Sequence, residues 1–96
     1  MLIMVKMEKT IYTPESARLG LWLRRQRQDK GLTMRDVGHL IEKPHSYIGK
    51  IEAGQRRLDV VELIWYCRQL GLDPHDAIDA IERDSSLELF TGKHGS

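Results

Sequence analysis

The chain has 96 residues, 41% of them hydrophobic, which suffices for one small soluble domain with a modest core. Its single cysteine excludes a disulfide framework and a zinc site built from cysteines. The formal net charge of +1 conceals an asymmetry, because residues 13–57 hold ten Lys or Arg against five Asp or Glu, whereas residues 58–90 hold two against eight. This distribution predicts that one end of the domain meets a polyanion and that the acidic half faces away from it.

Residues 1–12 alternate weakly between apolar and polar side chains, which favours an extended arm but also fits a disordered extension. Met7 could equally be the true start of the chain. The apolar run from Met1 to Val5 is too short for a signal peptide or a membrane span. We therefore expect a cytoplasmic protein that does not contact a membrane.

Between Thr13 and Arg83, apolar side chains at helical spacing predict five helices. Thr13, Thr33 and Asp59 are the expected N-caps of the first, second and fourth helices, and glycines are expected to end the first, third and fourth. The side chains expected to face the core are Leu19, Trp22, Leu23, Gln26, Val37, Leu40, Ile41, Tyr47, Ile48, Ile51, Leu63, Ile64, Tyr66, Cys67, Leu70, Ala77, Ile78 and Ile81.

The middle of the chain, residues 33–54, is its most informative part. Two amphipathic helices of about eight or nine residues, joined by about three, must cross steeply, as in a helix-turn-helix that reads DNA. The second of these helices is therefore the candidate for insertion into a major groove. Its outward side chains are short and polar, and a merely solvated helix face is the plainer alternative.

Motifs are spaced along most of the chain, namely Leu23-Arg24, Gly31-Leu32-Thr33, Asp36-Val37-Gly38, Tyr47-Ile48-Gly49-Lys50-Ile51-Glu52-Ala53-Gly54 and Leu70-Gly71-Leu72-Asp73. Over roughly residues 13–83 this pattern resembles the phage Cro/repressor-type family of helix-turn-helix proteins, also called the XRE family. The resemblance implies an all-α, compact five-helix bundle in residues 13–84, with an arm or extension in residues 1–12 and a tail in residues 85–96. It also implies a homodimer that binds a palindromic operator in double-stranded DNA and regulates transcription, most simply as a repressor.

The resemblance further assigns roles to individual residues. Those expected to contact base edges are Pro44, His45, Ser46, Gly49 and Lys50. Those expected to contact phosphates are Thr33, Met34, Arg35, Lys43, Gln55, Arg56 and Arg57. Arg27 and Glu52 match a pair that, in many members, forms a buried ion pair between the first and third helices.

Three positions depart from the family pattern. Glu42 occupies a turn position that often holds glycine, so we expect either a strained positive φ or a turn that bends differently. Pro44 replaces a common Ser or Thr, which removes a side-chain cap and a hydroxyl contact to phosphate. Met34 replaces a frequent glutamine, which removes one polar contact to DNA, so we expect Arg35 and Lys43 to supply more of the binding.

The acidic half holds more apolar residues than one small core easily covers. The dimer interface is therefore expected at Ile78, Ile81, Leu87, Leu89 and Phe90. The amino-terminal arm is the rival interface, since it could pair as a strand with its symmetry mate.

An antitoxin is the alternative function. Such a protein would bind a toxin through Leu87-Glu88-Leu89-Phe90 and autoregulate its operon. Enzymatic activity is not expected, because the sequence lacks a spaced Ser/His/Asp, Cys/His or paired-carboxylate constellation. His75 and Asp76 do not make one, since adjacent residues on a helix point in different directions. Neither a cofactor nor a metal is expected.

Overall fold

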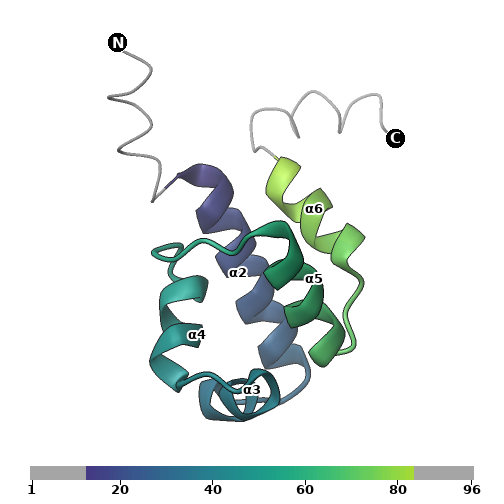
Figure 1. The fold of residues 1–96 in the computed structure, drawn as a ribbon. Helices are drawn as coiled ribbons and strands as arrows, with labels where there is room; N and C mark the ends of the chain where they lie inside the picture. The colour runs from purple at the N-terminus through teal and green to yellow at the C-terminus, as the bar shows by residue number, and fades with distance from the viewer. Residues whose placement is uncertain (1–12, 84–96) are drawn as a thin grey trace.

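The computed structural model describes residues 13–83, and within that range it contains five α-helices and no strand (Figure 1). The helices are α2 (Pro14–Asp29), α3 (Met34–Ile41), α4 (His45–Glu52), α5 (Val60–Gln69) and α6 (Pro74–Glu82). The expected five-helix, all-α architecture is confirmed. The expected arm and tail lie outside the described residues. Of the helices described, none is long and apolar enough to span a lipid bilayer.

Local hydrogen bonds set where the helices begin. Thr13 caps α2, and its hydroxyl accepts a hydrogen bond from the Ser16 N–H over 3.1 Å. Thr33 and Asp36 form a reciprocal capping box at the start of α3, and the hydrogen bond from the Thr33 N–H lowers the pKa of the Asp36 carboxyl. Asp59 forms a second box with Glu62 at the start of α5. The expected caps are confirmed.

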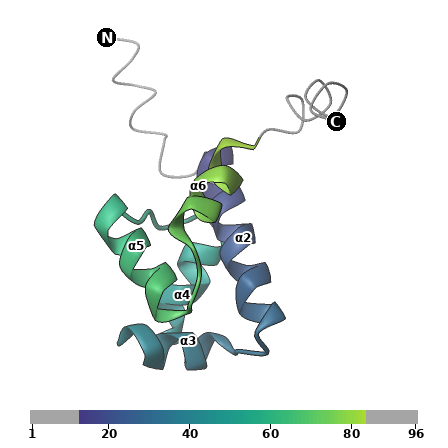
Figure 2. The same cartoon turned by 90° about the vertical axis from the view of Figure 1, so that its right-hand side faces the viewer.

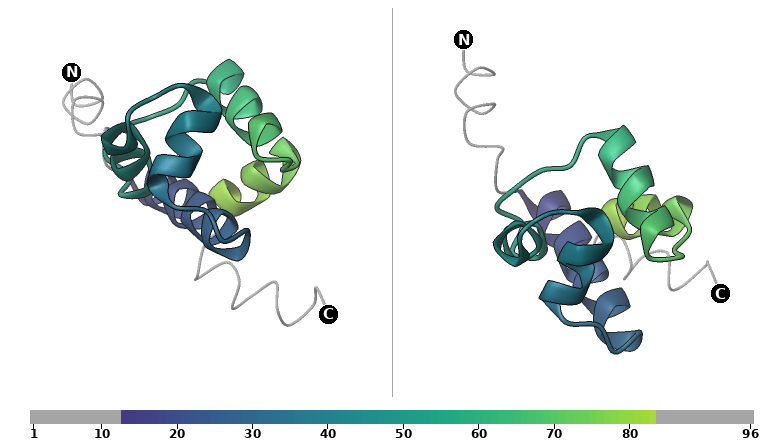
Figure 3. Two further views of the ribbon diagram at one scale, coloured as in Figure 1. Left: turned by 90° about the horizontal axis from the view of Figure 1, so that it is seen from below. Right: turned by 60° about the horizontal axis from the view of Figure 1, so that its bottom comes forward.

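Helix α2 is the central packing element of the domain, because it packs against both α4 and α6 (Figures 1 and 2). Seen from below, α3 lies across the end of the bundle, beside α4 and close to α5 (Figure 3). The main core cluster consists of Leu23, Val37, Ile41, Ile48, Ile51, Tyr66 and Leu70. A second cluster joins α5 to α6 through Leu63, Cys67 and Ala77. Burial of each large apolar side chain stabilises the fold by roughly 1.5–3 kcal/mol.

The structure corrects the expected core at two positions. Leu40 is 43% exposed, because Val37 and Ile41, four residues apart, already occupy the inward stripe of the short α3. Ile78 is 42% exposed, because Ala77 is the residue of α6 that enters the core. Arg18, on α2, is half-buried, and its Nε donates a hydrogen bond to the Ile81 carbonyl oxygen over 2.9 Å.

A close approach between α2 and the end of α4 depends on Gly20. A Cβ at this position would lie 2.6 Å from the Ile51 carbonyl oxygen and would also clash with that of Glu52. Because backbone atoms cannot move aside as a flexible side chain can, only glycine lets the two helices meet this closely. This contact sets where the end of α4 lies along the axis of α2.

Candidate nucleic-acid interface

The turn between α3 and α4 folds back tightly on Gly38. This residue is buried, and a Cβ there would lie 2.5 Å from the Lys43 carbonyl oxygen. The Lys43 N–H in turn donates a hydrogen bond to the Gly38 carbonyl oxygen over 2.8 Å. Glu42 ends α3 in the left-handed region, with φ 59° and ψ 46°. Glu42 therefore has the strained positive φ, the first of the two expected alternatives, and this conformation costs on the order of 1 kcal/mol.

Helix α4 begins without a side-chain cap. Pro44 takes the N-cap position with φ −66°, and no side chain accepts a hydrogen bond from the first turn. The Pro44 carbonyl oxygen accepts a bond from the Tyr47 N–H over 3.0 Å, which starts the helix. The expected loss of the cap is confirmed, and the proline ring lies exposed at the tip of the turn.

The outward side of α4 presents the predicted polar set. His45, Ser46 and Lys50 are all exposed. Gly49 is half-buried, and an added Cβ would meet only the sulfur of Met34 within 4 Å, at an ordinary 3.6 Å. Packing inside the domain therefore does not require a glycine here. A small residue on this side leaves room for a molecule that approaches α4 closely.

The residues predicted to contact phosphates do not form one uniform group. Thr33 and Arg35 are exposed at the start of α3, but the Thr33 hydroxyl is already engaged by the Asp36 N–H. Met34 is half-buried and packs on the main core cluster, so it has a structural contact besides any external one. Exposed side chains follow in the turn and in the loop after α4, at Lys43, Gln55, Arg56 and Arg57.

Tyr47 links two of these cations, which sequence reasoning missed. The Lys43 ammonium nitrogen lies 5.2 Å from the centre of the Tyr47 ring, and the Arg56 guanidinium carbon lies 4.8 Å from it. Both distances fall within the range of cation–π attraction. The spacing of Lys43 and Tyr47, four residues apart, is a weak sequence signal, but nothing in the sequence brings Arg56 to the same ring.

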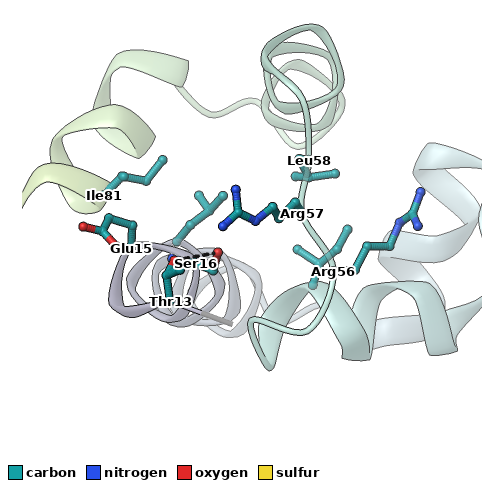
Figure 4. A pocket seen from close by; sticks show the side chains of 9 residues that line it. Thr13, Glu15, Ser16, Arg56, Arg57, Leu58 and Ile81 are labelled. Carbon is teal, nitrogen blue, oxygen red and sulfur yellow. Dashed lines mark hydrogen bonds between the residues drawn. The ribbon is translucent and has the colours of Figure 1, made fainter. Parts of the chain in front are cut away.

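Arg57 has different surroundings from its neighbour Arg56. In Figure 4, Arg57 points into a groove towards Ser16 and Ile81, whereas Arg56 points out of it towards the other side of the loop. The groove has a volume of about 460 Å³ and is lined by Thr13, Glu15, Ser16, Leu19, Ile51, Arg56, Arg57, Leu58 and Ile81. Arg56 therefore shares the Tyr47 ring with Lys43, whereas Arg57 points into the groove.

A buried ion pair holds α4 on α2. Arg27 Nε donates to Glu52 Oε2 over 2.6 Å, and Arg27 Nη2 donates to Glu52 Oε1 over 3.0 Å. A third hydrogen bond runs from Arg27 Nη1 to the Leu32 carbonyl oxygen over 2.9 Å. The hydrogen bonds to Glu52 raise the pKa of the Arg27 guanidinium further. The two parallel hydrogen bonds between Arg27 and Glu52 hold α4 in one rotation about its axis, and this rotation determines which of its side chains face outward.

The one cysteine among the described residues, Cys67, is buried. Burial raises the pKa of the Cys67 thiol to about 11, so a thiolate nucleophile is not available there near neutral pH. Among residues 13–83, no three His, Cys, Asp or Glu side chains are grouped as metal ligands.

Comparisons with known proteins agree with this geometry. A family model described as a helix-turn-helix domain matches residues 18–80. The restriction-modification controller protein C.AhdI from Aeromonas hydrophila is 28% identical, with a TM-score of 0.64 over 68% of this chain and 98% of that one. The clp gene regulator ClgR from Corynebacterium glutamicum is 26% identical, with a TM-score of 0.67 over 73% and 90% of the two chains. A second ClgR structure, 24% identical with a TM-score of 0.68 over 86% of each chain, has the same fold. No curated protein sequence matches this one.

Proposed function

This chain belongs to the helix-turn-helix domain family, and on that premise we propose that it binds a specific site in double-stranded DNA and regulates transcription. The observation that carries the proposal is the outward side of α4, where His45, Ser46 and Lys50 are exposed next to the tight turn from α3. The restriction-modification controller protein C.AhdI and the clp gene regulator ClgR, which are similar to this chain, support the same role. We propose the cytoplasm as the compartment in which it meets its DNA.

We assign sequence recognition to this side of α4. The Lys50 ammonium group can donate to guanine O6 and N7, and His45 or Ser46 can reach a purine N7 or a phosphate. Pro44 and Gly49 contribute shape rather than hydrogen bonds, because their small surfaces let base edges approach. A good base contact of this kind discriminates against a wrong base by about 1–3 kcal/mol.

Positioning on the DNA backbone is assigned to the surrounding cations and polar groups. The proposed phosphate contacts are Thr33, Met34, Arg35, Lys43, Gln55, Arg56 and Arg57. Among them, the pair of cations held at Tyr47 forms the most defined feature, because one ring orders side chains from the turn and from the loop. These contacts fix register and orientation without reading sequence.

We further propose that the protein acts as a homodimer on a palindromic operator and represses transcription by occupancy. One α4 offers too few contacts for a rare site, whereas two helices in successive major grooves, about 34 Å apart, double them. For the dimer, exposed Ile78 and half-buried Ile81 remain candidates on α6, and Leu87, Leu89 and Phe90 lie outside the described residues. The segment Leu87-Glu88-Leu89-Phe90, which would bind a toxin in the alternative function, also lies outside the described residues.

The test is a footprint of the full chain on the DNA upstream of its own gene. We expect two protected regions about one helical turn apart, with protection that survives excess unrelated DNA. Equal protection of all sequences, abolished together by modest salt, would show only non-specific binding to phosphates and would contradict the proposal.

A further inference from the structure

The groove into which Arg57 points lies where the start of α2, the loop between α4 and α5, and the end of α6 meet (Figure 4). Its volume of about 460 Å³ falls within the range of small-molecule sites in proteins. Three half-buried apolar side chains line it, Leu19, Leu58 and Ile81, together with the buried Ile51. The groove can therefore cover a short hydrocarbon body that would otherwise contact water.

Two hydrogen-bond donors in this groove have no acceptor among residues 13–83. Arg57 points into the groove towards Ser16, and within the described part of the chain its guanidinium makes neither an ion pair nor a hydrogen bond (Figure 4). The Thr13 hydroxyl donates to the Ser16 hydroxyl oxygen over 3.1 Å, so the hydrogen of the Ser16 hydroxyl remains available. An anion with acceptor oxygens would satisfy both donors.

The charges in the groove favour a ligand with one negative charge. Glu15 lines the end of the groove opposite to Arg57, and its carboxylate lies 3.7 Å from the Arg18 guanidinium (Figure 4). A second anionic group on the ligand would meet this carboxylate. A single carboxylate matches the planar fork of one guanidinium. The groove therefore suits a small acid that has one carboxylate and an apolar body.

We propose that this groove binds a small organic acid, with its carboxylate at Arg57 and Ser16 and its hydrocarbon body on the apolar wall. The same loop carries Arg56, whose guanidinium lies on the Tyr47 ring together with Lys43. A carboxylate bound at Arg57 neutralises a cation assigned to phosphate, one residue from Arg56. Occupancy of the groove should therefore weaken binding to DNA, and this effector role, unlike the site itself, rests on the proposed function.

Titration of the isotope-labelled full chain with hexanoate, followed by NMR, tests the site without DNA. Hexanoate supplies a carboxylate and a short hydrocarbon body, hexanamide keeps the body without the charge, and acetate keeps the charge without the body. At constant ionic strength, hexanoate should shift the amide signals of Ser16, Arg57 and Ile81 and bind about tenfold or more tightly than either analogue. Its Kd should lie in the millimolar range, because the probe has few atoms.

Substitutions of two exposed arginines show whether the charge in the groove matters. Arg57→Gln should weaken hexanoate binding about tenfold or more, because it removes the charge and keeps most of the side-chain length. Arg24→Gln makes the same change on α2, outside the groove, and should leave the Kd for hexanoate unchanged. Ser16→Ala should weaken binding less than Arg57→Gln. Thermal unfolding checks that each variant is folded.

The results separate this inference from the proposed function. Hexanoate binding that Arg57→Gln weakens and Arg24→Gln does not supports the site, whatever the protein does with DNA. No shift at tens of millimolar, equal binding of hexanoate and either analogue, or a Kd that Arg57→Gln leaves unchanged would overturn it.

The effector role is tested on DNA sites selected by the wild-type chain. Saturating hexanoate should lower the affinity for such a site severalfold, whereas hexanamide should not change it. An affinity that hexanoate leaves unchanged would overturn the effector role. A chain that binds hexanoate but no DNA would overturn the proposed function and leave the acid site standing.

Discussion

The inward and outward sides of α4 differ in where their partners come from. Inward, Ile48 and Ile51 are buried and Glu52 is bound by Arg27, so the chain itself supplies every neighbour. Outward, His45 and Lys50 are exposed, and a Cβ added at Gly49 would meet only Met34 within 4 Å. One helix of eight residues thus combines residues selected for folding with residues available for binding. Inward substitutions should change the free energy of unfolding, and outward ones should change DNA affinity.

The largest expected effect is on the inward side. Arg27→Ala or Glu52→Ala each leaves a buried charge without its partner, so each should lower the free energy of unfolding by ~3–5 kcal/mol. The double variant should cost less than the sum of the two, because it leaves no unpaired charge. Chemical denaturation measures all three, with Arg24→Ala, at an exposed position of α2, as the control. Additive single effects would refute the coupling.

Substitutions of two glycines, Gly38 and Gly49, should change stability in opposite directions. Gly38→Ala forces a Cβ against the Lys43 carbonyl oxygen and should destabilise the fold by about 1–3 kcal/mol. Gly49→Ala meets no such obstacle and should stabilise α4 by up to about 1 kcal/mol, yet weaken DNA binding by crowding the outward side. Thermal unfolding and fluorescence anisotropy with labelled DNA test the pair. A Gly49→Ala protein with undiminished DNA affinity would remove Gly49 from the contact surface.

The cations around Tyr47 should act on all DNA sequences alike. Arg56→Ala should weaken binding uniformly and reduce the slope of log affinity against log salt by about one unit. Arg57→Ala should have a smaller effect, because its side chain points into the groove near Ser16. Tyr47→Phe keeps the ring and should preserve the slope, whereas Tyr47→Leu should reduce it. Identical slopes for all four variants and the wild type would exclude this group from phosphate binding.

The smallest expected effect is in the turn. Glu42→Gly removes the strain of a left-handed residue and should stabilise the domain by about 1 kcal/mol. Glu42→Ala is the control, since alanine keeps a Cβ and should bring no such gain. Equal stabilities of the two variants in urea denaturation would show that the turn stores no strain.

The sequence predicts features that depend on neighbours along the chain. The caps at Thr13, Thr33 and Asp59 were predictable because each involves residues within three positions. The match of residues 18–80 to the helix-turn-helix family also confirms the resemblance to Cro/repressor-type proteins. The family pattern placed Arg27 with Glu52, a contact across 25 positions that periodicity alone does not reveal.

Features that depend on how helices meet were missed. Leu40 and Ile78 fit a helical stripe, but the short helices α3 and α6 rotate them away from the core. The hydrogen bond from Arg18 to Ile81 and the arrangement around Tyr47 join residues from separate elements. Tertiary packing, rather than local preference, decides such contacts.

Lys50 is the exposed side chain of α4 best suited to donate to a base edge, so its substitution tests whether the outward side of this helix reads DNA sequence. Binding sites are selected from a random DNA pool with the wild-type chain, and the affinity of wild type and Lys50→Ala is then measured for the selected site and for each single-base variant. Lys50→Ala should lose ~1–3 kcal/mol of binding free energy on the selected site, and the base preference should flatten at one base pair while the other positions keep theirs. Equal weakening on every sequence, or an unchanged preference at every position, would contradict it.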